Sequence, residues 1–142
     1  MGIQVITLNK KGERLKKIVL FIAEKSLVYL KKEEIYLEIY LADEFLMKEI
    51  NQKFRHQDKR AKVLSFIEPK NFPHPETKNK VLGEIYLNSD YFSKTGQPKK
   101  ELVFFLVHGL LHLLGYEHFK KRDRIKMERL NEKICQDVLY CH

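Results

Sequence analysis

The pattern of apolar and polar positions along this 142-residue chain predicts four strands. A period of two residues is typical of strands that bury one face, and it occurs at Ile3–Leu8 and at Ile35–Leu41. In the second of these, isoleucine and leucine occupy one face and Tyr36, Glu38 and Tyr40 occupy the other. Shorter apolar runs predict two further strands, at Val63–Phe66 and at Val81–Asn88.

Apolar residues spaced three and four apart predict four helices. The first spans Glu13–Leu30, with Leu15, Ile18, Val19, Ile22 and Leu27 toward the core. Asp43 is suited to cap a second helix, from Glu44 to about Phe54. The remaining two cover residues 99–114, after Pro98, and Arg122 to about Tyr140.

The prolines at positions 69, 73 and 75 predict a loop over residues 67–80. Because strands and helices mix without strict alternation, we expect one α+β domain over residues 1–142, with a small mixed β-sheet packed against several helices. The longest uninterrupted apolar stretch, Ile18–Ala23, is too short to span a membrane. The start of the chain alternates like a strand and lacks the pattern of a secretory signal, so we expect a cytoplasmic protein with Cys135 and Cys141 reduced.

Three of the six histidines, His108, His112 and His118, fall within eleven residues. Positions 108 and 112 lie on one face of a helix, about one turn apart. Gly115 can end that helix in a left-handed conformation, which allows His118 to approach the other two. Three neutral imidazoles leave Zn²⁺ with one open position for water, whose pKa the metal lowers to about 7. We therefore predict a His-x3-His-x5-His zinc site at the helix C-terminus, although imidazole also suits other divalent ions.

Two other interpretations of the histidines stay open. A structural zinc usually has four protein ligands, and the two cysteines could add at most one. Zinc peptidases share the histidine spacing, but they carry a glutamate as general base after the first histidine, where this chain has Gly109. Glu117 precedes the third histidine and is better suited to orienting a ligand than to acting as the base.

The string His108-Gly-Leu-Leu-His112-Leu-Leu-Gly115-Tyr-Glu-His118 resembles the signature His-Gly-x-Leu-His-Leu-x-Gly-Tyr-Asp-His of the YbeY family. Three further segments are similar in order and spacing: Ile50-Asn51-Gln-Lys-Phe-Arg55, Ala61-Lys62-Val-Leu-Ser-Phe66 and Leu82-Gly83-Glu84-Ile85. The family pattern has Thr-Asp where this chain has Ala61-Lys62, and Asp where it has Glu84 and Glu117.

This resemblance implies a metal-dependent endoribonuclease, specific for single strands, that acts in ribosomal RNA maturation and ribosome quality control. It implies rRNA precursors and a ribosomal subunit or ribosomal proteins as partners, and it implies no specificity for DNA. Arg55 is the candidate for binding the scissile phosphate, because guanidinium binds phosphate through two parallel hydrogen bonds. Its alternative is a solvated arginine at a helix end. An RNA-binding or ribosome-binding assembly factor with a structural metal is the competing function.

The formal net charge of +8 agrees with a polyanionic partner. Basic residues gather in two clusters that we expect to border the metal. The first precedes the Val63 strand and the second follows His118; their members are Lys53, Arg55, Lys59, Arg60 and Lys62, and Lys120, Lys121, Arg122, Arg124 and Lys126.

Overall fold

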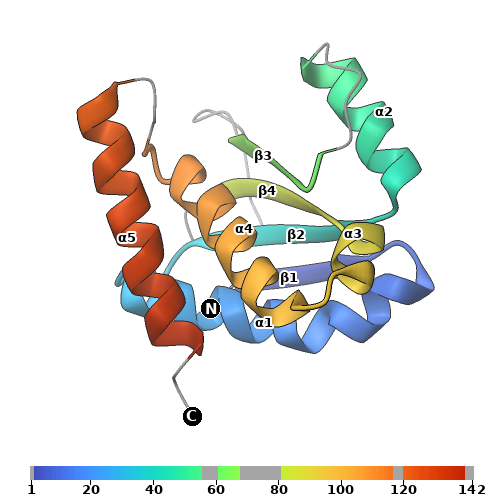
Figure 1. Cartoon of the computed structure of the whole chain (residues 1–142), viewed down its shortest axis with the longest axis horizontal. Coiled ribbons are helices and arrows are strands. Elements are labelled where there is room, and N and C mark those ends of the chain that lie inside the picture. Colours follow the sequence, from blue (N-terminus) through green and yellow to red (C-terminus); the bar gives the residue numbers. More distant parts are fainter. Residues whose placement is uncertain (1, 56–60, 68–80, 117–119, 140–142) are drawn as a thin grey trace.

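The computed structural model describes residues 2–55, 61–67, 81–116 and 120–139 (Figure 1). Its elements follow in the order β1 (Gly2–Thr7), α1 (Lys10–Tyr29), β2 (Tyr36–Ala42), α2 (Glu44–Arg55), β3 (Val63–Ile67), β4 (Val81–Asn88), α3 (Ser89–Lys94), α4 (Pro98–Leu113) and α5 (Lys121–Leu139). The predicted α+β class is confirmed. Within the described ranges, no helix has the length and apolar character needed to cross a membrane.

The four strands form one mixed sheet in the order β1-β2-β4-β3. β1, β2 and β4 are parallel, with Ile3 opposite Leu37 and Ile39 opposite Ile85. β3 runs antiparallel to β4 at the edge, with Leu64 opposite Tyr86. The parallel pair β1 and β2 is joined through α1, as a crossover connection requires.

Alternation along the strands divides the sheet into two faces. On one face, Leu37, Ile39 and Leu41 of β2 and Ile85 and Leu87 of β4 are fully buried in a core shared with α1, α3, α4 and α5. The other face packs a smaller cluster with α2, centred on Ala42, Met47 and Leu64. α2 and α4 therefore cover opposite faces, with β3 and β4 between them (Figure 1).

Side-chain caps account for two differences from the sequence prediction. α1 begins three residues before Glu13, since the Oδ1 of Asn9 accepts a hydrogen bond from the Gly12 N–H at 2.7 Å. The short helix α3 was not predicted; the Oδ1 of Asn88 accepts from the Tyr91 N–H at 3.1 Å and starts that helix directly after β4. The predicted cap of α2 is confirmed, because Asp43 accepts from the Leu46 N–H at 2.8 Å.

Candidate metal centre

Helix α4 places His108 and His112 side by side near its C-terminus. Its buried face carries Leu102, Leu106, Gly109 and Leu113, and both histidines lie on a half-exposed face. Their Nε2 atoms are 3.0 Å apart and their ring centroids are 4.5 Å apart. The predicted convergence of these two imidazoles is therefore present in the structure.

The separation of the two Nε2 atoms fits a shared cation. Two nitrogens bound to one tetrahedral zinc at about 2.0–2.1 Å lie about 3.3 Å from each other. The same pair can also share one proton, with one ring donating and the other accepting according to tautomer. Neutral imidazoles at this spacing are suitable ligands for Zn²⁺ and for other divalent transition metals.

The chain turns sharply after α4, at Gly115, where the sequence predicts the end of the helix. Gly115 has a φ of 98°, in the region that favours glycine. The Gly115 N–H donates to the His112 carbonyl at 3.1 Å, and the Tyr116 N–H donates to the Leu111 carbonyl at 3.0 Å. This pair of hydrogen bonds is typical of a helix that ends at a left-handed glycine. The helix therefore ends directly after His112, at Leu113.

The third predicted ligand, His118, lies outside the described residues, as do Glu117 and Phe119. Within the ranges that the structure describes, no group of three or more His, Cys, Asp or Glu side chains is placed to hold a metal ion. The three-histidine site therefore stays a prediction, supported by the pair on α4 and by the turn at Gly115.

Gly109 lies against the sheet rather than beside the histidines. A Cβ atom at this position would lie 3.2 Å from the Val63 Cγ2 and 3.6 Å from two carbon atoms of Ile85. The position that carries the general base in zinc peptidases is thus packed on β3 and β4, where a carboxylate would be buried. This packing disfavours the peptidase interpretation.

A cleft of about 430 Å³ opens beside His108, between α4 and α5. We call it the α4–α5 cleft; Phe104 and His108 line it from α4, and Arg124, Met127, Glu128 and Asn131 line it from α5. It continues along α5 past Glu132 to Cys135. The pKa of the Cys135 thiol is raised to about 11, mainly by burial and secondly by the charge of Glu132. Sequence reasoning missed this cleft, because it depends on how the two helices pack.

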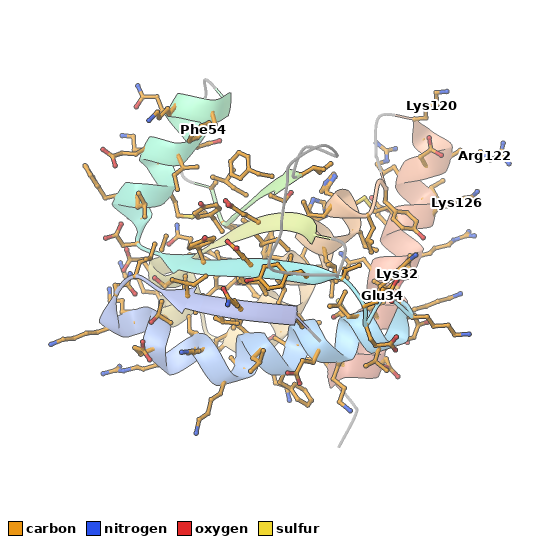
Figure 2. The ribbon with its side chains drawn as sticks, turned by 180° about the vertical axis from the view of Figure 1, so that it is seen from behind. Lys32, Glu34, Phe54, Lys120, Arg122 and Lys126 are labelled. Atoms are coloured by element: carbon orange, nitrogen blue, oxygen red, sulfur yellow. The ribbon has the colours of Figure 1, made fainter. Side chains whose placement is uncertain are left out.

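The members of the basic cluster after His118 do not all face the same way. Lys120, directly before α5, and Arg122 and Lys126 in its first turns project outward (Figure 2), whereas Arg124 lines the α4–α5 cleft. In the first cluster, Lys59 and Arg60 lie outside the described residues. Among the described members of the two clusters, Arg124 lines the same cleft as His108.

Lys62, which replaces the family's aspartate, lies over two aromatic rings. Its Nζ is 4.7 Å from the ring centroid of Tyr91 and 5.1 Å from that of Phe105. A hydrogen bond from Tyr91 lowers the pKa of the Glu101 carboxyl, with smaller contributions from Thr95 and from the charge of Lys62. A cation at position 62 is thus accommodated by aromatic faces and a nearby carboxylate.

Arg55 is the last residue of α2, the helix that packs on the opposite face of the sheet from α4 (Figure 1). Its side chain is outside what the structure describes, so the predicted contact with phosphate stays a prediction. Asn51, one turn earlier, is buried.

Comparison with protein families decides where this chain belongs. The model of the family described as "Endoribonuclease YbeY" matches residues 4–139. The chain is a member of the YbeY family. Proteins named endoribonuclease YbeY from Persephonella marina and from Wolbachia sp. subsp. Drosophila simulans are 32% and 35% identical to it. These alignments cover 94% and 97% of this chain and 92% and 96% of the relatives.

The fold is also similar to a solution structure of a protein from Thermotoga maritima, with a TM-score of 0.57 and 28% identity. That alignment covers 96% of this chain and 88% of the other. The family resemblance therefore extends over nearly the whole domain and beyond its histidine signature.

The structure gives a physical reason for a second YbeY motif, Leu82-Gly83-Glu84-Ile85. Gly83 has a φ of 149°, and a Cβ there would lie only 2.2 Å from the Phe66 carbonyl oxygen and 3.1 Å from the Leu113 Cδ2. Glycine thus allows β3 and the end of α4 to approach β4 closely. Glu84 accepts a hydrogen bond from the Tyr86 hydroxyl at 3.0 Å. Burial and, after it, this hydrogen bond raise the pKa of Tyr86 to about 12.

Proposed function

We propose that this YbeY-family protein is a metal-dependent endoribonuclease that hydrolyses single-stranded RNA during ribosomal RNA maturation and ribosome quality control. The observation that carries the proposal is the convergence of the His108 and His112 Nε2 atoms at the end of α4, in a chain whose relatives are named as endoribonucleases. The packing of Gly109 on the sheet supports an RNA substrate over a peptide, because it removes the peptidase's general base.

In this proposal His108, His112 and His118 hold one Zn²⁺ or a similar divalent ion. When bound, such an ion polarises a phosphoryl oxygen and lowers the pKa of its water. The protein's own groups fix the arrangement: α4 holds two imidazoles on one face, and Gly115 turns the chain back toward them. Arg55 is proposed to bind the scissile phosphate through its guanidinium group.

The proposed partners are rRNA precursors together with a ribosomal subunit or its proteins, and the proposed location is the cytoplasm, where these partners occur. The formal net charge of +8 supports a polyanionic partner, since lysine and arginine bind phosphates with release of counterions. The outward-facing Lys120, Arg122 and Lys126 provide a basic helix face for such contacts (Figure 2).

The test combines metal analysis with RNA cleavage. We expect His112→Ala to lose bound metal and to slow cleavage of single-stranded RNA by more than about 100-fold, since even groups that only orient metal ligands contribute about 10–100-fold. The matched control, His74→Ala, removes a histidine outside the signature and should retain both properties. Full cleavage by a metal-free His112→Ala protein would contradict the proposed mechanism.

Arg55→Ala separates phosphate binding from structure in the same assay. We expect slower cleavage with unchanged metal content, whereas Lys53→Ala, two residues earlier on α2, should have a weaker effect. Metal loss in Arg55→Ala would assign that arginine a structural role. A metal held by four protein ligands, with no RNA cleavage, would favour the competing function, an assembly factor with a structural metal.

A further inference from the structure

The α4–α5 cleft contains an aromatic surface next to a proposed metal ligand. Phe104 is 50% exposed, which is unusual for a phenylalanine on a helix that is otherwise well packed. Its ring lies 18° from parallel with the His108 ring, at a centroid distance of 6.4 Å. It also contacts Phe105 edge-on, with centroids 5.1 Å apart and the ring planes at 90°. The ring is therefore supported by its neighbours while its cleft side remains open.

Buried side chains form the floor of the cleft. Asn131 is 5% exposed; its Nδ2 donates to the Phe104 carbonyl at 3.4 Å, and its Oδ1 accepts from the Cys135 Sγ at 3.0 Å. Met127, also buried, adds an apolar surface. Asn131 thus ties the two helices together beneath Phe104, and the cleft volume of about 430 Å³ falls within the range of about 300–1,000 Å³ typical of small-molecule sites.

Charge along the cleft changes sign from one end to the other. α4 and α5 lie side by side and run in opposite directions (Figure 1), so Arg124 lies toward the histidine end and Glu132 lies toward the far end. Arg124 suits a phosphate near the metal ligands. Glu128 and Glu132 repel phosphate, but as carboxylates they accept hydrogen bonds from amino groups.

We propose that the α4–α5 cleft binds one unstacked base of the RNA, with its ring on Phe104 and its polar edge toward Glu128 and Glu132. This inference rests on the proposed endoribonuclease function and adds a base-recognition site to it. A base inside a duplex is already stacked and paired, whereas a base in a single strand is free to enter. The site therefore gives a physical source for single-strand preference.

The carboxylates also predict which bases bind best. Guanine, adenine and cytosine carry exocyclic amino groups that donate to a carboxylate, and guanine has an adjacent ring N–H as a second donor. Uracil has no amino group, and its single donor on that edge, N3–H, lies between two carbonyl oxygens that a carboxylate repels. We therefore expect guanine to bind best and uracil worst.

Binding is tested without cleavage, in a His112→Ala background, with single-stranded RNA that carries the fluorescent base 2-aminopurine. We expect the fluorescence of the probe to change on binding, because the probe exchanges its neighbouring bases for the Phe104 ring. Phe104→Ala should abolish this change and weaken RNA binding by about tenfold or more, as expected for one lost base–aromatic stack. Phe104→Tyr should keep both properties. Phe45→Ala is the matched control, since Phe45 is 72% exposed on α2, away from the cleft.

Cleavage by the otherwise wild-type protein provides the second readout. RNAs with each base in turn beside the cut site should be cleaved best with guanine and worst with uracil, and Glu128→Gln with Glu132→Gln should reduce that preference. Thermal unfolding checks that every variant folds. Equal cleavage of all four RNAs, or a Phe104→Ala protein that binds and cleaves like Phe45→Ala, would overturn the base site even though RNA is cleaved. Absence of cleavage by the wild-type protein would instead overturn the proposed function.

Discussion

Gly109 lies on the face of α4 that packs against the sheet, whereas the neighbouring His108 lies on the half-exposed face. The histidine on one side of it converges with His112, while position 109 itself touches Val63 and Ile85 of the sheet. A side chain at 109 would have to enter the interface between helix and sheet. Glycine at this position thus leaves no side chain where zinc peptidases carry their base, and it permits α4 to lie close to β3 and β4.

Two substitutions at Gly109 distinguish the effect of side-chain volume on stability from the effect of a buried charge. We expect Gly109→Ala to change the free energy of unfolding by less than about 1 kcal/mol, because better helix propensity offsets a tight contact with Val63. Gly109→Glu should destabilise the protein by more than about 3 kcal/mol, since it buries a carboxylate without a partner. Urea unfolding measures both. A stable Gly109→Glu protein with peptidase activity would contradict this account.

At the scale of the element, the C-terminus of α4 determines where the chain goes after the second histidine. The helix ends at Leu113, and the hydrogen bonds from the Gly115 and Tyr116 N–H groups satisfy the His112 and Leu111 carbonyls. Among the described residues, none has an atom within 4 Å of the place that a Gly115 Cβ would occupy. The cost that we expect for a side chain there comes from the backbone angle.

Gly115→Ala should destabilise the protein by about 1–2 kcal/mol, because its positive φ is unfavourable for an L-residue. If His118 completes the metal site, the same substitution should weaken metal binding. Gly96→Ala is the matched control: a Cβ there also meets nothing within 4 Å, and its φ is not positive, so we expect no loss of stability. Thermal unfolding and metal titration measure the two effects. Equal stability of the two variants would contradict the backbone argument.

At the scale of the whole molecule, Asp90 joins three helices that are distant in sequence. From α3, its carboxylate accepts from the Lys11 Nζ of α1 at 2.8 Å and from the Glu44 N–H of α2 at 2.8 Å. The hydrogen bond from Lys11 is the main cause that lowers the pKa of Asp90, followed by the bond from the Glu44 N–H. These bonds connect the layer that carries the histidines with the helix that carries Arg55.

Because the folded state lowers the pKa of Asp90, its contribution to stability is present above the ordinary aspartate value of about 3.9 and is lost as the pH falls through the lowered pKa. We expect Asp90→Asn to reduce the free energy of unfolding by about 1 kcal/mol at pH 7. The difference from the wild type should shrink below about pH 4. Unfolding curves from pH 2 to 7 measure this, with Asp137→Asn on α5 as control. A difference that is constant down to pH 2 would contradict the argument.

Most of the fold could be predicted from local pattern. Burial on one face produces a period of two in β2 and of three to four in α1, so both elements and their inward residues were correct. α3 is only six residues long and depends on the Asn88 cap, so it carries too few apolar positions to show a period. The start of α1 was predicted too late for a similar reason, because the Asn9 cap and not an apolar residue defines it.

The sequence by itself determined the family signature, the helical spacing that brings His108 and His112 together, and the glycine that ends their helix, because each depends on residues close in the chain. Other features depend on the tertiary structure, because they bring together segments that are far apart in sequence. They are the α4–α5 cleft, the contact of Lys62 with two aromatic rings and the packing of Gly109 on the sheet. Local periodicity specifies which face of an element is buried, but the partner of that face is selected by packing across the whole domain.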